Sequence, residues 1–145
     1  MPNSKPLGHD DESGFAFVKE LLQGEPTCAI NFDRLQLHPK KGYIIFEFLL
    51  CDEKQARVTP HTSHPSKYWY KNRRKFISLY RVAKDLKATL YLVNYSKMGT
   101  PNEDKVKVIR VDELSSKGIA KETVWETSRA AFAWWFRKIN RECCQ

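Results

Sequence analysis

The protein has 145 residues and a mass of 17.0 kDa, which fits one domain. Hydrophobic residues make up 41% of the chain and charged residues 29%, which excludes a wholly disordered chain. No apolar run approaches the ~20 residues that span a bilayer, and residues 1–14 are too polar for a secretory signal. The four cysteines show no CxxC spacing, so we expect reduced thiols. These features predict a soluble, cytoplasmic protein with no membrane partner.

Positive charge is concentrated in one part of the chain. The whole sequence carries a formal net charge of +8, and the window 57–87 alone holds nine basic residues against one acid, Asp85, which also nets +8. Such a concentration favours a polyanionic partner, in the first place nucleic acid, with DNA preferred over RNA. A solvated face on a basic protein is the alternative. The nine basic residues are Arg57, Lys67, Lys71, Arg73, Arg74, Lys75, Arg81, Lys84 and Lys87.

The hydrophobic pattern predicts helices and strands in the order α-β-β-α-β-β-α. Residues 1–12 are expected to form a flexible arm, and residues 13–145 a single domain. A short turn joins the first two strands, which makes them antiparallel neighbours. The order predicts an α/β (α+β) fold with helices flanking one mixed β-sheet. The predicted elements are helices over residues 15–23, 68–87 and 122–141, and strands over residues 28–37, 43–51, 88–95 and 106–111.

Glu47 is the only charged residue in the run 43–51, which is otherwise apolar on both faces of the strand. Such runs are typical of central strands covered on both sides. An isolated carboxylate there costs on the order of several kcal/mol unless it is paired, protonated or bound to a metal ion. A structural pair with a basic residue of the following helix is therefore the alternative to a role in chemistry.

Asp33 is the expected companion of Glu47, because it lies on the preceding strand with thirteen residues between the two. Antiparallel neighbours are about 5 Å apart, so two such carboxylates can share one hard cation. Considered alone, Asp33 is more typical of a strand end or a turn.

The arrangement resembles that of the PD-(D/E)xK nuclease superfamily. The resemblance covers roughly residues 15–95: an early helix, a strand with Asp33, a hairpin, a strand with Glu47, a basic helix and a further strand. It implies a restriction-endonuclease-like fold and hydrolysis of phosphodiester bonds in DNA or RNA. It also implies that Asp33 and Glu47 bind Mg²⁺ or Mn²⁺, which activates water and screens the phosphate.

The sequence departs from the family pattern E-x-K at Leu49, where the pattern has lysine. Asp52, Glu53 and Lys54 match (D/E)-x-K, but they fall at the polar exit of the strand. Lys75 falls inside the apolar arc of the following helix on a helical wheel, and relatives of the superfamily relocate the catalytic cation in this way. We therefore assign the catalytic cation to Lys75, with snorkelling into water or a structural pair with Glu47 as alternatives.

The same helix offers groups that could hold a nucleic-acid strand. Lys71, Arg73, Arg74 and Arg81 are predicted to contact phosphates. Trp69, in an aromatic run beside them, could stack on a base and contribute ~1–3 kcal/mol. The alternative for this ring is that it closes the core over the start of the helix.

The predicted last helix contains more aromatic residues than one stripe can bury, among them Trp125, Trp134 and Trp135. Exposed members could form a homodimer or a partner surface. Three functions therefore follow from the sequence: a metal-dependent nuclease, a non-catalytic nucleic-acid-binding module with a degenerate site, or a protein-interaction factor. The isolation of Glu47 favours the first, and Leu49 favours the second.

Overall fold

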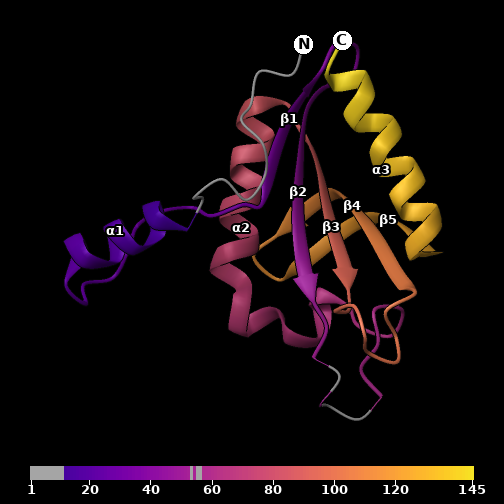
Figure 1. The fold of residues 1–145 in the computed structure, drawn as a ribbon. Coiled ribbons are helices and arrows are strands. Elements are labelled where there is room, and N and C mark those ends of the chain that lie inside the picture. Colours follow the sequence, from indigo (N-terminus) through magenta and orange to yellow (C-terminus); the bar gives the residue numbers. More distant parts are fainter. Residues whose placement is uncertain (1–11, 53, 55–56) are drawn as a thin grey trace.

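The computed structural model describes residues 12–52, 54 and 57–145, which form an α+β fold with one five-stranded mixed sheet and three α-helices (Figure 1). The predicted arm at residues 1–12 therefore lies outside the described residues, apart from Glu12. In chain order the elements are α1 (Ser13–Leu22), β1 (Arg34–His38), β2 (Gly42–Leu50), a 3-10 helix (Pro65–Tyr68), α2 (Trp69–Leu86), β3 (Thr89–Tyr95), β4 (Lys105–Ser115), β5 (Gly118–Ser128) and α3 (Arg129–Cys143).

The strands follow one another across the sheet in the order β1-β2-β3-β4-β5. Neighbours are antiparallel except β2 and β3, which are parallel and are connected through α2. The predicted hairpin between β1 and β2 is confirmed, and Gly42 closes it in the left-handed region at φ 78°. The sheet is therefore mixed, as expected.

One helix layer covers each face of the sheet, and side chains of β2 alternate between the two layers. Ile45 and Leu49 pack with Phe76 and Leu79 of α2, whereas Ile44 and Phe46 pack on the α3 side. The prediction that β2 is a central strand covered on both faces is thus confirmed. Among the described residues no helix is long and apolar enough to cross a membrane.

The prediction of one long last helix over 122–141 is wrong in its first part. Residues 118–128 form β5, which pairs with β4 through a hairpin, and α3 begins only at Arg129. Ser128 caps α3, because its side chain accepts a hydrogen bond from the Ala131 N–H at 3.1 Å. Thr123, Val124 and Thr127 are β-branched, which favours a strand over a helix. The element order is therefore α-β-β-α-β-β-β-α.

The first predicted strand is also shorter than expected. Residues 28–33 have no regular secondary structure, and β1 begins at Arg34. This irregular segment runs from α1 to the sheet, and Figure 1 shows α1 projecting away from the rest of the fold. No residue of α1 is buried.

Candidate active site

Glu47 and Lys75 form an ion pair between the sheet and α2. Glu47 lies on the α2 side of β2 and is 5% exposed, and the Lys75 Nζ lies 2.7 Å from its Oε1. The expectation that Lys75 turns toward Glu47 from the apolar side of the helix is confirmed. The Lys75 side chain is 41% exposed, so this ammonium remains accessible from solvent.

The Glu47 carboxylate is only partly satisfied by this pair. Its Oε2 is buried and has no hydrogen-bond partner among the described residues. Burial raises the pKa of Glu47, the hydrogen bond and charge of Lys75 lower it, the charge of Asp33 raises it, and the backbone of Asp33 lowers it. One oxygen of Glu47 is therefore buried without a hydrogen-bond partner among the described residues.

A cavity of about 620 Å³ opens beside the pair. Its lining combines Glu47 of β2 with Arg74, Lys75 and Ser78 of α2 and with the irregular residues 27–31. Two cationic side chains and a hydroxyl next to a buried carboxylate suit a phosphate group, because Arg and Lys both bind phosphate oxygens.

Asp33 lies just before β1, so the prediction that Asp33 is on the strand next to that of Glu47 is wrong. Arg34, the first residue of β1, pairs with Phe46, so Asp33 is one residue outside the paired part of the strand and near the height of Glu47. The Asp33 Oδ2 accepts a hydrogen bond of 2.7 Å from the Phe48 N–H. Asp33 lines a separate hollow of about 540 Å³ together with Phe48 and Phe136. The two carboxylates are thus electrostatic neighbours, but they border different hollows.

The candidate metal ligands in this region are the carboxylates of Glu47 and Asp33. Mg²⁺ is usually bound by one or two carboxylates, with water and substrate oxygens completing its coordination. Glu47 and Asp33, which interact through their charges, match this pattern in the number of carboxylates. Within the part of the chain that the structure describes, no group of three or more His, Cys, Asp or Glu could hold a metal ion. Among the described residues a site ligated by protein side chains alone therefore does not fit, and the Glu47 and Asp33 carboxylates line separate hollows.

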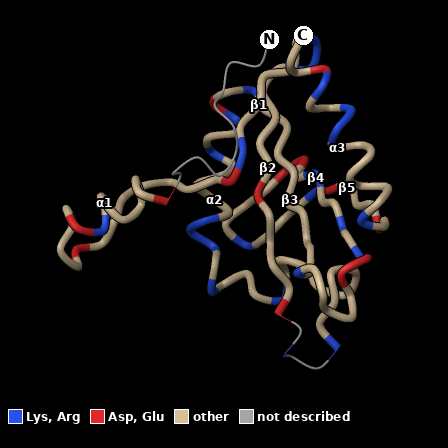
Figure 2. Tube along the Cα trace, viewed as in Figure 1, with Lys and Arg blue, Asp and Glu red and all other residues tan. Residues whose placement is uncertain are grey.

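The basic residues predicted to hold nucleic acid lie on α2, where Figure 2 shows Lys and Arg along the helix. All four of them, Lys71, Arg73, Arg74 and Arg81, are exposed. Arg74 is also part of the cavity beside Glu47. This face of α2 is therefore accessible to a polyanion from the solvent.

Trp69 corrects the prediction of a base contact. The residue is 3% exposed, its ring stacks on Phe76 at 5.6 Å, and its indole N–H donates to the Ser116 carbonyl at 3.1 Å. Because the ring is enclosed in the core, it is not available for stacking on a base. Tyr70, the next residue, is 83% exposed and is accessible from solvent.

The alternative motif at residues 52–54 lies at the end of β2. Asp52 accepts a hydrogen bond of 3.0 Å from the Lys54 N–H, and both residues line a hollow with Lys97. Glu53, the middle residue of the match, lies outside the described residues.

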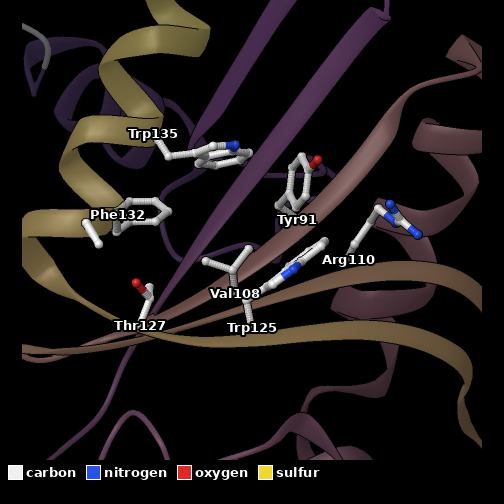
Figure 3. A pocket seen from close by; sticks show the side chains of 8 residues that line it. Tyr91, Val108, Arg110, Trp125, Thr127, Phe132 and Trp135 are labelled. Carbon is white, nitrogen blue, oxygen red and sulfur yellow. The ribbon is translucent and has the colours of Figure 1, made fainter.

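A different hollow, of about 320 Å³, lies on the α3 side of the sheet (Figure 3). Its walls are mainly aromatic: the rings of Tyr91 and Trp135 meet edge to face at 5.3 Å, and Arg110 lies 5.7 Å from the Trp125 ring. Sequence reasoning missed this hollow because it placed Trp125 on a helix. The alternation of Thr123, Trp125 and Thr127 is the signal that could have indicated a strand.

The tryptophans of α3 divide between core and surface. Trp135 packs against Phe46 at 6.0 Å in the α3-side core. Trp134 is 59% exposed, with the Lys138 ammonium 5.7 Å from its ring. The predicted homodimer through this helix would thus have to use Trp134, and it stays a prediction.

Comparisons of this chain with protein-family models, with curated proteins and with solved structures found no match.

Proposed function

We propose that the protein hydrolyses phosphodiester bonds of nucleic acid, DNA in the first place, with a divalent metal ion. The observation that carries this proposal is the buried Glu47 carboxylate, with one oxygen unpartnered, beside Lys75 and Arg74 in an open cavity. Burying a carboxylate is costly, and a site that tolerates the cost is a candidate for function. The resemblance to PD-(D/E)xK nucleases supplies the reaction class.

Each residue has a role that follows from its place. Glu47 and Asp33 would hold Mg²⁺ or Mn²⁺, which when bound activates water and screens phosphate charge. Lys75 stabilises negative charge that develops on the phosphate, and Arg74 positions the phosphate in the cavity. Lys71, Arg73 and Arg81 bind neighbouring phosphates along α2.

The proposed site has a cationic side chain although residue 49 is leucine and not lysine. Leu49 is 9% exposed and belongs to the core beneath α2, so a lysine at this position would have to displace core packing. Lys75 brings its ammonium to Glu47 from the helix instead. The proposal therefore moves the cation of the E-x-K pattern to Lys75.

A second function, nucleic-acid binding without hydrolysis, is favoured by a specific observation. Lys75 already compensates the charge of Glu47, and the described residues include no larger cluster of metal-binding side chains. In this case the pair is structural, and the exposed basic residues of α2 account for the function.

A cleavage assay with Mn²⁺ distinguishes the two functions. Plasmid and single-stranded DNA are incubated with the wild type, with Glu47→Gln and with Asp33→Asn. The matched control is Glu113→Gln, which changes an exposed carboxylate on β4. Cleavage by the wild type and the control, and its loss in both site variants, supports hydrolysis. Binding of DNA by a wild type that does not cleave supports the second function.

A further inference from the structure

Helix α1 presents an exposed apolar face. None of its residues is buried, although Phe15 is 71%, Phe17 58% and Leu21 62% exposed. At 100° per residue, the five large apolar side chains occupy about one half of the helix circumference. An isolated helix of this length is only marginally stable in water. Its face is formed by Phe15, Phe17, Val18, Leu21 and Leu22.

The sheet carries a matching uncovered surface, which we name the β1 stripe: Leu35, Leu37 and Tyr43. These side chains are 40%, 55% and 36% exposed, and the register places Leu37 opposite Tyr43 on the neighbouring strand. The helix on this side, α2, packs on β3 and β4 and against Ile45 and Leu49 of β2. The stripe is therefore a solvent-exposed apolar surface of the sheet.

The other face of β1 is bonded to α3. Arg34 donates to the Asn140 side chain at 2.8 Å, Gln36 donates to the Cys143 sulfur at 3.3 Å, and His38 is bonded to Glu142 at 2.8 Å. Since these three residues are held by α3, Leu35 and Leu37 must lie on the opposite face. The exposure of the stripe thus follows from the packing of β1.

We infer that the protein forms a symmetric dimer in which α1 of each copy packs on the β1 stripe of the other. The structure directs α1 away from its own sheet, and residues 23–33 connect it to β1 (Figure 1). An extended segment of this length reaches ~36–40 Å, which is enough to bridge two copies. Reciprocal exchange covers both apolar surfaces of both copies through one interface.

The exchanged helix would lie beside the candidate active site. Tyr43, Ile45 and Glu47 follow one another on the same face of β2, and residues 27–31 of the connecting segment line the cavity at Glu47. A helix of ten residues is about 15 Å long, so α1 of the second copy would extend from the stripe toward this cavity. The dimer would thus complete one wall of the site.

Light scattering on the full chain tests the dimer. The wild type should have twice the mass of 17.0 kDa at micromolar concentration. Val18→Asp and Leu37→Asp should weaken the dimer by about tenfold or more, since each puts a charge into an apolar contact. Ala16→Asp is the matched control, because it makes the same kind of change on the opposite side of α1 and should leave the dimer intact. A monomeric wild type, or equal effects of Ala16→Asp and Val18→Asp, would overturn the inference.

Cross-linking tests the exchange itself. Chains with Val18→Cys are mixed with chains with Leu37→Cys, and oxidation should give a covalent pair that neither chain forms to the same extent alone. The four native cysteines are present in all samples and set the background. A third chain carries both Val18→Cys and Leu37→Cys. If this chain is a monomer and forms an internal cross-link, α1 folds onto its own stripe, and the inference is overturned. None of these readouts depends on cleavage, so they can fail independently of the proposed function.

Discussion

Each face of the sheet contains a pair of ionisable residues with one buried member among the described residues, and the two pairs differ in how completely that member is hydrogen-bonded. On the α3 side, His38 is 5% exposed; its Nε2 lies 2.8 Å from Glu142, and its Nδ1 accepts the N–H groups of Lys40 and Lys41. On the α2 side, the Glu47 Oε2 has no partner within the described residues.

This difference separates a structural clamp from a candidate site. Both ring nitrogens of His38 are used to tie the β1–β2 turn to the end of α3, which leaves no group available for chemistry. Glu47 instead keeps one free oxygen next to a solvent-accessible lysine and a cavity. Unsatisfied buried polar groups need an explanation, and a ligand supplies one.

The largest effect is expected from removing the ammonium of Lys75. Lys75→Met should lower DNA cleavage by about a hundredfold or more, because charge on the phosphate is no longer stabilised. It also leaves Glu47 without its ion-pair partner, which costs on the order of 1–3 kcal/mol of stability. Cleavage rates are therefore measured well below the melting temperature of the variant.

Lys84→Met is the control for this prediction, because it removes an exposed ammonium from the same helix. It should cleave DNA like the wild type. If Lys75→Met cleaves DNA as fast as the wild type, the ion pair between Lys75 and Glu47 has only a structural role, like the pair of His38 with Glu142.

The next effect concerns the exposed charges of α2 rather than the buried pair. The DNA-binding constant should fall with salt, with a log–log slope of roughly −3 to −4 on duplex DNA if about four cations contact phosphates. Replacing Arg74 and Arg81 by Ala should reduce the slope by about two. Replacing Arg137 and Arg141 of α3 by Ala is the control and should change it little. A salt-independent affinity would contradict nucleic-acid binding through α2.

The smallest effect, in the dependence of stability on pH, compares the two pairs directly. Burial raises the pKa of Glu47 above its ordinary 4.5. The stability that Glu47 contributes to the folded state is therefore full below pH 4.5, and it is lost as the pH rises through the raised pKa. The hydrogen bond from His38 lowers the pKa of Glu142, so its contribution is present above pH 4.5 and is lost as the pH falls through the lowered value.

The two glutamine variants should therefore respond in opposite directions. As the pH rises above 4.5, the stability of Glu47→Gln relative to the wild type should increase. As the pH falls below 4.5, the loss of stability that Glu142→Gln shows at higher pH should become smaller. Urea denaturation between pH 3 and pH 8 measures both. Parallel pH profiles for the two variants would contradict the distinction between the pairs.

The sequence predicts the α2 side of the fold better than the α3 side, for physical reasons. The apolar run around Glu47 and the apolar arc containing Lys75 are strong periodic signals, and they bring these two residues together. Residues 122–128 have spacings that fit either a helix or a strand, and pairing with β4 decides for the strand. Local sequence does not contain that long-range partner.

Trp69 and α1 show a further limit of the sequence pattern. An aromatic residue among basic ones is equally consistent with stacking on a base and with closing the core, and only the packing on Phe76 decides. The amphipathic pattern of α1 indicates a surface to be covered, but it does not identify the covering surface. The exposure of the β1 stripe provides that information.

The most direct test of the unsatisfied carboxylate is a titration with Mn²⁺, followed by the electron paramagnetic resonance signal of the free ion. The wild type should bind Mn²⁺, Glu47→Gln should lose this binding, and Glu142→Gln should bind like the wild type because its carboxylate belongs to the clamp with His38. A wild type that binds no Mn²⁺, or binding that survives in Glu47→Gln, would contradict the assignment of Glu47 as a metal ligand.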